Sequence, residues 1–357
     1  MKQRTLVELI IDRVGNVNVF NLIKEDDIAL HGDYISVVDD EWIEEYIDTI
    51  NRHYQVILSD VAGNFFSSER LNELEQIGYE FYRQFIPETI REYLKKTRHR
   101  YLYIRPDKNL ARIPWELLYD GKKFLNQLFF LGRGAKYDFT PRGRRLPSYP
   151  IRMLIIVDPT GTLKWAPIEA EELTNNLMKK FSSSELVIDI VSDPELNRLK
   201  LINRIRENDM VHFIGHSVDD ENDSDNSGWK MGQGKLLKTG EILKSNISPA
   251  LVFSHSCKSA GSIARAFMGS GVRHFIGCRH DVLEEKNVIE FASLFYSLVF
   301  AGNTIGKAFH TATVKNKQSH LLSFNYVLYS NPKQPVLSFE GESGKKSFLK
   351  GEDVIRL

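Results

Sequence analysis

Short apolar runs alternate with longer stretches of helical spacing along the second half of the chain. Each run has the length of a buried strand, and the runs lie at Ile151–Val157, Leu186–Val191, Asp209–His216, Ala250–Ser254 and Arg273–Gly277. Apolar residues at helical spacing lie between and after them, at Ile168–Phe181, Asp193–Arg206, Glu285–Phe300 and Asn303–Lys315. Asp193, followed by a proline, is the predicted N-cap of its helix. This alternation predicts an α/β fold with a mostly parallel sheet and helices on both faces.

The first half of the chain has an α/β pattern of its own. Thr5–Arg13 and Val17–Leu22 alternate apolar and polar residues on either side of a Gly-Asn turn, which predicts a β-hairpin. Apolar residues recur at helical spacing in Asp40–Tyr54 and again in a second helix opened by Ser67 or Ser68. A short strand is predicted at Arg100–Arg105.

A basic, proline-rich segment separates the two halves. Residues 141–150 read P-R-G-R-R-L-P-S-Y-P, a composition typical of a solvated linker. We place the boundary near Leu146. It divides the chain into an N-terminal α/β half at 1–146, a second half at 147–340 and a charged tail at 341–357. Late strands are predicted in the second half at Phe324–Tyr329 and Pro335–Phe339.

Two of the predicted strands end in residues that carry chemistry. His216 ends one of them, and Cys257 lies just beyond another. Because the carboxyl ends of parallel strands meet at one edge of a sheet, we expect these side chains at the same edge. A base and a thiol there are the minimum for cysteine nucleophilic catalysis. The helix predicted from Ser259 would favour the thiolate form of Cys257 through its N-terminal partial charge.

Composition narrows the partners that this chain can have. The 357 residues carry a formal net charge of zero and a near-neutral pI of about 7.2, which argues against a nucleic-acid surface. We find neither an apolar run long enough to span a membrane nor a signal peptide at Met1–Val7. The two cysteines, Cys257 and Cys278, are therefore expected to be reduced thiols in a cytoplasm, with Cys278 structural. A disulfide between them is possible but not favoured.

The order of motifs resembles a known family. H-F-I-G-H-S at 212–217 followed by L-V-F-S-H-S-C-K-S-A at 251–260 is similar to the CHAT family of caspase-like cysteine peptidases. Three further segments resemble motifs of that family in the same order, at Arg112–Leu118, Ile155–Pro159 and Leu328–Pro332. The resemblance covers about Tyr101–Phe339 and implies a caspase-like, parallel-rich sheet. Ser217, where the family usually has glycine, and Arg279-His280, where a tryptophan often stands, depart from the pattern.

The resemblance implies a role for each residue of a Cys-His dyad. His216 would be the base and Cys257 the nucleophile. The backbone N–H groups of Ser217 and Cys257 would hold the oxyanion, since a backbone donor survives any side chain. Serine at 217 raises one question, because glycine adopts positive φ easily and serine rarely does.

The resemblance also implies a substrate pocket. Asp158 and His255 would line the pocket for the residue before the scissile bond, and Asp158 would pair with a basic residue there. The charges do not all agree, because Arg279 and a protonated His255 would favour an acidic residue. Alternatively, Asp158 simply turns the chain ahead of Pro159.

The function predicted from these residues is a cysteine endopeptidase without a cofactor. It would act by limited cleavage of a protein partner, under the control of another chain or signal. One alternative is a binding or scaffold module of caspase-like fold whose dyad is silent. A second alternative is a thiol hydrolase of small amide or thioester substrates.

The same residues and a nearby acidic stretch could also be interpreted as metal sites, but the sequence supports this less well. Zinc could be considered at His212, His216, His255 and Cys257, but the first two histidines lie on a strand and lack the H-E-x-x-H pattern. The acidic stretch Asp219–Gly228 resembles a calcium loop that starts at Asp223, with Asp225 and Gly228 at positions three and six. Its twelfth position is Gly234, where a bidentate glutamate is needed. We therefore predict no metal. The acidic stretch is either a solvated loop or a contact for a basic substrate.

Overall fold

The computed structural model describes residues 5–24, 32–62, 67–98, 100–134, 147, 149–220, 223, 226–282, 286–315 and 322–337. These residues divide into two compact units. The first takes the described residues up to 134 together with 322–324 and Asn331–Lys333, and the second takes the rest. The predicted boundary at Leu146 and the tail at 341–357 lie outside the described residues, so the division at that position stays a prediction.

The first unit contains a mixed sheet. The alternation in its first strands buries every second residue, Val7, Leu9 and Ile11 among them, and confirms the predicted hairpin. The strands are β1 (Leu6–Val14), β2 (Val17–Lys24), β3 (Tyr34–Val37), β4 (Tyr101–Pro106) and β5 (Phe130–Arg133). β1 to β3 pair antiparallel, whereas β1, β4 and β5 run parallel.

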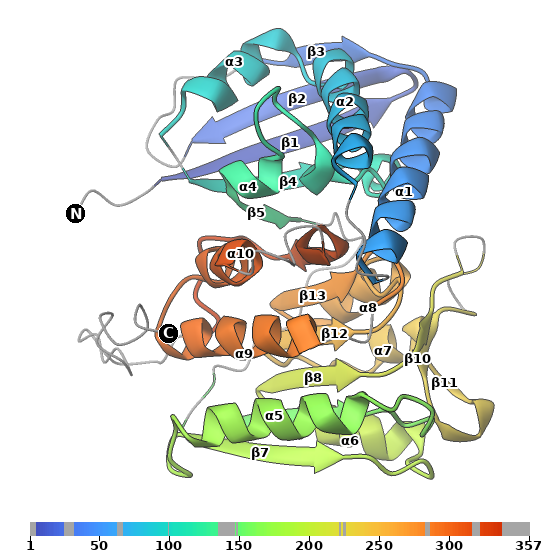
Figure 1. Ribbon diagram of the computed structural model, residues 1–357, viewed down its shortest axis with the longest axis vertical. Coiled ribbons are helices and arrows are strands. Elements are labelled where there is room, and N and C mark those ends of the chain that lie inside the picture. The colour runs from blue at the N-terminus through green and yellow to red at the C-terminus, as the bar shows by residue number, and fades with distance from the viewer. Residues whose placement is uncertain are drawn as a thin grey trace. The chain divides into compact units, whose positions relative to one another are not determined.

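The second helix of this unit begins where the sequence supplies a cap. The side chain of Ser67, one of the two predicted caps, accepts a hydrogen bond from the backbone N–H of Arg70. Rings of Tyr46 and Phe81 stack between the first two helices, with centroids 3.6 Å apart. The helices are α1 (Asp40–Ala62), α2 (Ser68–Phe85), α3 (Glu88–Lys96) and the short α4 (Leu125–Leu128). Figure 1 shows α1 and α2 side by side.

The second unit has the predicted, mostly parallel sheet. Its strand order is β14-β13-β12-β8-β6-β7, and only β14 runs antiparallel to its neighbour. The strands are β6 (Ile151–Val157), β7 (Leu186–Val191), β8 (Met210–Ile214), β12 (Leu251–His255), β13 (His274–Cys278) and β14 (Tyr326–Tyr329). β8, β12 and β13 are buried along their whole length, as the apolar runs predicted.

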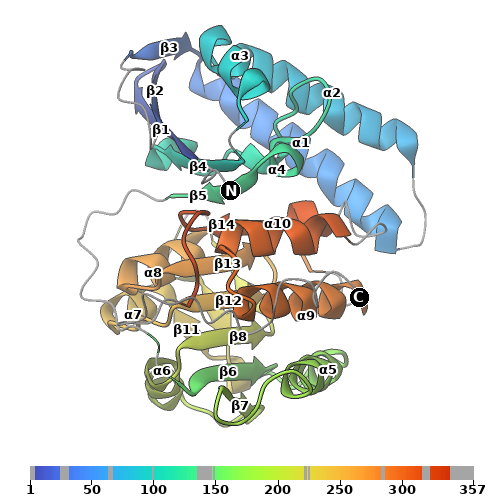
Figure 2. The same cartoon turned by 90° about the vertical axis from the view of Figure 1, so that its left-hand side faces the viewer.

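Helices cover both faces of this sheet (Figure 2). One hydrophobic core lies under α5 (Ala166–Met178), α9 (Lys286–Phe300) and α10 (Ile305–Lys315). The other lies under α6 (Arg198–Glu207), α7 (Thr239–Lys244) and α8 (Ser262–Ser270). The predicted α/β class, with a mostly parallel sheet and helices on both faces, is confirmed.

A small antiparallel sheet follows β8. It consists of β9 (Ser217–Val218), β10 (Gly228–Lys230) and β11 (Leu236–Lys238). Its central residue is Trp229, which is fully buried, stacks on Phe213 and donates a 2.8 Å hydrogen bond to Ser254 Oγ. This packing ties the segment after His216 to strand β12, and so to the segment that carries Cys257.

Two predicted elements differ from the structure. The helix expected from Asp193 begins five residues later, because Asp193 closes a turn by accepting from Glu195 N at 2.8 Å. Asn197 is the actual N-cap and accepts from Lys200 N at 2.9 Å. Of the last predicted strand, Pro335 forms an isolated bridge with Thr304, and residues 338 and 339 lie outside the described part. No helix within the described ranges is long and apolar enough to cross a bilayer.

Candidate active site

Cys257 lies two residues beyond the end of β12. Its sulfur accepts a hydrogen bond from the backbone N–H of Val282 at 3.3 Å. Its carbonyl oxygen accepts a hydrogen bond from the hydroxyl of Ser217, which fixes the position of the turn. The next residue, Lys258, has a left-handed backbone with φ of 52°. Left-handed non-glycine residues are uncommon and concentrate at functional sites.

The environment of Cys257 keeps its thiol protonated. Burial raises the pKa of this thiol, the nearby Asp281 carboxylate raises it further, and the Val282 N–H donor only partly opposes them. The expected help from a helix N-terminus is missing. Helix α8 starts at Ser262, and the Asp219 carboxylate already accepts from Ser262 N at 3.2 Å. The prediction that the helix favours the thiolate is therefore wrong.

His216 lies two residues beyond β8 and is held by a loop from the neighbouring strand. Its Nε2 forms a 2.9 Å hydrogen bond with Thr162 Oγ1. Thr162 Oγ1 is in turn 2.8 Å from Thr160 Oγ1, which donates to Asp158 Oδ1 at 2.5 Å. Among the described residues, no hydrogen bond joins His216 to Cys257.

Asp158 directly follows β6 and is buried, with φ of 31°. Its carboxylate accepts hydrogen bonds from Thr160 and from Leu163 N, the latter at 2.5 Å. Burial would raise the pKa of this carboxyl, but these donors outweigh burial and hold the pKa below its usual range. Its oxygens face its own loop, and the residue does not line the cavity beside Cys257. Its role in reading a basic residue stays a prediction.

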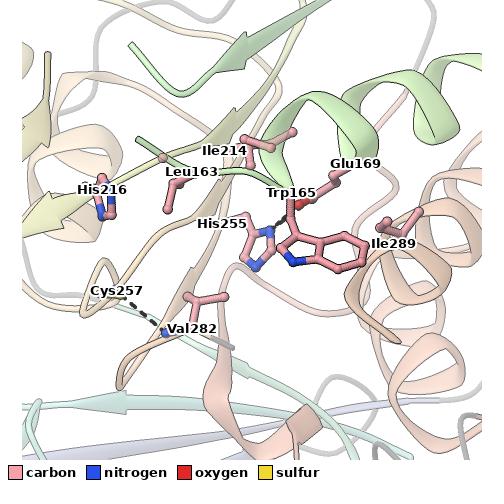
Figure 3. A pocket seen from close by; sticks show the side chains of 11 residues that line it. Leu163, Trp165, Glu169, Ile214, His216, His255, Cys257, Val282 and Ile289 are labelled. Carbon is pink, nitrogen blue, oxygen red and sulfur yellow. Dashed lines mark hydrogen bonds and ion pairs between the residues drawn. The ribbon is translucent and has the colours of Figure 1, made fainter. Parts of the chain in front are cut away.

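A cavity of about 90 Å³ connects the predicted site residues (Figure 3). His216, Cys257 and His255 all line it. That His255 binds substrate there stays a prediction. Glu169 is a fourth polar residue in its wall. The remaining side chains of the wall are apolar, namely Leu163, Trp165, Ala166, Ile214, Val282 and Ile289. The volume suffices for several water molecules or one side chain.

Glu169 joins two histidines beneath this cavity. It lies in the first turn of α5 and is 4% exposed. Its carboxylate accepts from His212 Nε2 at 3.1 Å and from His255 Nδ1 at 2.8 Å. The other ring nitrogen of His212, Nδ1, is 3.1 Å from the hydroxyl of Tyr296. Both histidines thus point one nitrogen at the same carboxylate.

The charges in this network follow from burial and from those hydrogen bonds. Burial would raise the pKa of Glu169, but His255 and His212 outweigh it and lower the pKa to about 2, so the carboxylate is ionised. Burial lowers the pKa of His212 despite the carboxylate beside it, so that imidazole is neutral at pH 7. In the neutral ring Nε2 donates to Glu169, and Nδ1 accepts from the Tyr296 hydroxyl.

Ser217 accommodates the replacement of glycine without strain. The described non-glycine residues with positive φ are Asp158, Gln233, Asn246 and Lys258, and Ser217 is not among them. Residue 217 therefore does not need the positive φ that glycine adopts easily, and serine fits the backbone here. Its N–H as an oxyanion donor stays a prediction, as does that of Cys257.

Sequence reasoning missed three residues of the site. Glu169 looked like an acidic residue at a helix N-terminus, and Thr162 like an ordinary loop residue. Trp165, which lines the cavity while 45% exposed, was also overlooked. One signal was present in the sequence: His212 lies inside an apolar strand, and a buried imidazole requires a hydrogen-bond partner.

The rival metal site does not assemble in the described part of the chain. The histidines considered as zinc ligands divide their hydrogen bonds, with His212 and His255 on Glu169 and His216 on Thr162. No group of three or more potential ligands there is arranged to hold a metal ion. Asp225, needed for the calcium interpretation, lies outside the described residues.

A search of curated protein sequences finds no match. Among solved structures, the chain is similar to Saccharomyces cerevisiae separase in two crystal structures of the separase–securin complex, at 3.0 and 2.6 Å resolution. In both, the TM-score is 0.47 and the identity 16%, and the match covers 68% of this chain. It spans only 16% and 17% of the two separase chains.

A family model gives the assignment. The model described as CHAT domain matches residues 75–334, well over half of the 357 residues. That range contains the strands β6, β8 and β12 and every residue lining the cavity. The chain therefore belongs to the CHAT-domain family and has its caspase-like, protease-type scaffold.

Proposed function

We propose that this protein is a cysteine endopeptidase in which Cys257 is the nucleophile and His216 the general base. The observation that carries the proposal is their common cavity, which lies beyond the carboxyl ends of parallel strands β8 and β12. Its apolar walls can exclude water from the reacting atoms, and it opens beside the thiol. Cys278, in contrast, is fully buried and reaches no substrate.

The hydrogen bonds of the Asp158 loop determine which nitrogen of His216 is the base. An ionised Asp158 can only accept, so the Thr160 hydroxyl donates to it. The Thr160 oxygen then accepts from Thr162, and the Thr162 oxygen accepts from His216 Nε2. With its hydrogen on Nε2, a neutral His216 has its lone pair on Nδ1. Nδ1 is therefore the atom that takes the proton of Cys257.

The reaction then proceeds through an acyl-enzyme. His216 Nδ1 takes the thiol proton while the sulfur attacks the peptide carbonyl carbon and forms a C–S bond. The protonated His216 gives this proton to the leaving amine as the C–N bond breaks, which leaves a thioester. Water activated by the same nitrogen hydrolyses the thioester, and the proton returns to sulfur. The backbone N–H groups of Ser217 and Cys257 are the proposed donors to the oxyanion.

The resting site is not primed for this reaction. Since burial and Asp281 raise the pKa of Cys257, and since His216 is bonded to Thr162 rather than to sulfur, a rearrangement has to bring base and thiol together. We infer that a regulatory protein partner or another signal drives it, and that the substrate is a protein. Two free thiols fit a reducing compartment, and we propose a cytoplasmic location.

The same observations favour one other function. The thiol is protonated and His216 is not hydrogen-bonded to it. A caspase-like scaffold in this state could act by regulated binding of a partner, without cleaving it. The two functions differ in one consequence, because only a peptidase forms an acyl-enzyme. Trapping that intermediate separates them.

A peptidyl acyloxymethyl ketone, which alkylates a thiol after its peptide occupies the substrate cleft, tests the proposal. Because alkylation is irreversible, the adduct accumulates even when base and thiol come together only rarely in the absence of a partner. Incubation and intact-mass analysis should therefore show one adduct, located at Cys257. The adduct should be absent in Cys257→Ala and slow in His216→Ala, while iodoacetamide still alkylates His216→Ala. If every peptide sequence tried fails to label a wild-type protein that iodoacetamide alkylates at Cys257, the peptidase assignment is wrong and the binding module stands.

A further inference from the structure

Among the described residues that line the cavity beside Cys257, one buried polar atom has no hydrogen-bond partner. Nε2 of His255 is buried and has no hydrogen-bond partner among the described residues, and the residue as a whole is only 6% exposed. The opposite nitrogen, Nδ1, is occupied by Glu169 at 2.8 Å. Figure 3 shows the His255 ring between the Glu169 side chain and Val282. A buried polar group without a partner costs free energy unless a ligand supplies one.

Glu169 determines what this nitrogen can do. An ionised carboxylate only accepts hydrogen bonds, so Nδ1 of His255 must carry a hydrogen. In the neutral ring, Nε2 is then a lone-pair acceptor. The Glu169–His255 pair therefore presents a hydrogen-bond acceptor to the cavity, backed by a full negative charge.

Among the described residues, no lysine or arginine is paired with that charge. The ion-pair partners of Glu169 are His212 and His255, and His212 is held neutral by its burial. No lysine or arginine of the described residues lines the cavity. A buried charge left uncompensated is strongly destabilising, whereas a cation brought by a ligand would compensate it.

We propose that this cavity binds a basic side chain, lysine or arginine, at the residue before the scissile bond, and that the Glu169–His255 pair recognises it. The proposal rests on the peptidase function of Cys257. The cation donates a hydrogen bond to His255 Nε2 and neutralises the Glu169 charge behind the ring. Its aliphatic stem packs against apolar walls such as Leu163 and Ile214.

Trp165 adds a second, independent preference for a cation. Its indole lines the cavity and is still 45% exposed, so it is accessible to an incoming side chain. Tryptophan is the aromatic side chain that attracts cations best through its ring face. A substrate carboxylate would instead face the Glu169 charge in a low-dielectric wall and be repelled.

The cationic residues near the site do not reverse this preference. Lys258 is exposed and Arg279 is half-buried, and neither lines the cavity. Burial, with the charges of Arg279 and Lys258, lowers the pKa of His280 to about 3, so His280 is neutral at pH 7. The negative charge of Glu169 thus dominates inside the cavity.

The test compares four acyloxymethyl ketones that differ only in the side chain next to the warhead: lysine, arginine, norleucine or glutamate. Norleucine keeps the lysine stem and lacks the ammonium. The rate of labelling at Cys257 should be about ten- to a hundredfold higher for the better basic probe than for norleucine, as a charged hydrogen bond implies. Glutamate should label most slowly. A probe containing norleucine or glutamate that labels as fast as both basic probes overturns the proposal.

Matched variants locate the determinant. Glu169→Gln should reduce the ratio of basic to norleucine labelling to near one, while Glu171→Gln, an exposed neighbour on α5, should leave the ratio unchanged. Asp158→Asn distinguishes the two carboxylates, because it should slow all four probes together and keep their ratio. A preference that survives Glu169→Gln and disappears in Asp158→Asn overturns the assignment to Glu169.

The outcomes also separate this proposal from the peptidase function. If the peptide probes label Cys257 but the basic ones are not preferred, the proposed preference for a basic residue is refuted. The proposal that the protein is a peptidase is then unaffected. Complete failure of peptide labelling, with normal alkylation by iodoacetamide, refutes both. Should Glu169→Gln fail to fold, the wild-type ratio still tests the preference for a basic residue, and loss of that preference in Asp158→Asn still overturns the assignment to Glu169.

Discussion

Two carboxylates lie at the same edge of the sheet and are held in opposite ways. Asp158 takes its hydrogen bonds from Thr160 and Leu163, within five residues along the chain. Glu169 takes its hydrogen bonds from His212 and His255, which are 43 and 86 residues away. Both carboxyls have a pKa below the usual range, yet only the second lines the cavity.

This difference indicates what each carboxylate does. A carboxylate whose own loop supplies its donors fixes the shape of that loop, and through Thr162 it fixes the orientation of His216. A carboxylate held by imidazoles from two sheet strands transmits its charge through a ring to whatever occupies the cavity. We therefore propose that the Asp158 loop orients the base, His216, and that Glu169 selects the substrate. Four experiments can break or sharpen that division.

The largest effect on activity is expected from removing the Cys257 thiol, because the proposed roles of both carboxylates depend on it. Cys257→Ala removes the nucleophile and should reduce peptide cleavage about a million-fold, as such losses do in catalytic triads. Cys278→Ala is the matched control: it should cost only packing, about 1–2 kcal/mol of unfolding free energy, and leave the rate intact. Initial rates on a cleaved peptide and thermal unfolding measure both. If Cys257→Ala cleaves the peptide at a comparable rate, Cys257 is not the nucleophile. The roles proposed for the two carboxylates are then wrong.

The Asp158 side of the comparison is tested at Thr162. Thr162→Val removes the hydroxyl that links the loop to His216 Nε2, so the tautomer is no longer fixed and kcat should fall about a hundredfold. KM should change little, because Thr162 does not line the cavity.

Thr162→Ser is the control, since it keeps the hydroxyl and should restore most of the rate. An equal loss in the serine variant would mean that packing of the threonine methyl, and not its hydrogen bond, matters.

The Glu169 side is tested by pH. In the unfolded chain Glu169 takes up a proton near its ordinary pKa of 4.5, while in the folded protein burial and the two histidines leave the pKa at about 2. The unfolded state therefore binds more protons between these values, and stability falls as pH drops from about 4.5 towards 2. His212, with a lowered pKa, adds a loss that begins below about 6.5.

Thermal unfolding measured from pH 7 to pH 3 should show both losses. Glu169→Gln should flatten the part of the curve below pH 4.5, whereas Glu171→Gln should not. An unchanged acid limb in Glu169→Gln would mean that the carboxyl is not held ionised by its histidines.

The smallest effect is expected on stability, from backbone strain at the site. Asp158 and Lys258 have left-handed backbones, whereas Glu169 lies in a regular helix. Left-handed conformation costs a side-chain-bearing residue about 1–2 kcal/mol, part of which glycine recovers. Lys258→Gly should therefore stabilise the protein by about 0.5 kcal/mol, measured by chemical denaturation. Destabilisation by the same amount would show that the lysine makes contacts that outweigh the strain.

Features that depend on the local pattern of apolar and polar residues could be predicted from the sequence. The order of strands and helices followed from apolar periodicity, and the positions of His216 and Cys257 at strand ends followed from that order. His255 in the cavity came from the family resemblance. The helix start at Asp193 failed because Asp and Asn are equally good caps, and only the fold decides between Asp193 and Asn197.

The missed parts of the site depend on contacts between distant segments. Glu169 meets His212 and His255 only once α5, β8 and β12 have packed together. The raised pKa of Cys257 likewise depends on burial and on Asp281, and no local pattern shows either. The hydroxyl chain from Asp158 to His216 required actual distances, since Thr160 and Thr162 are unremarkable as loop residues.

The burial of Cys278 has a practical consequence. Because this is the only other cysteine and its side chain is inaccessible, the natural sequence already offers a single site for thiol-specific reporters. A trifluoromethyl tag coupled to Cys257 would place a fluorine nucleus beside the cavity without any substitution. Its NMR line would then report when a partner or a peptide changes the surroundings of the thiol, in solution and under native conditions.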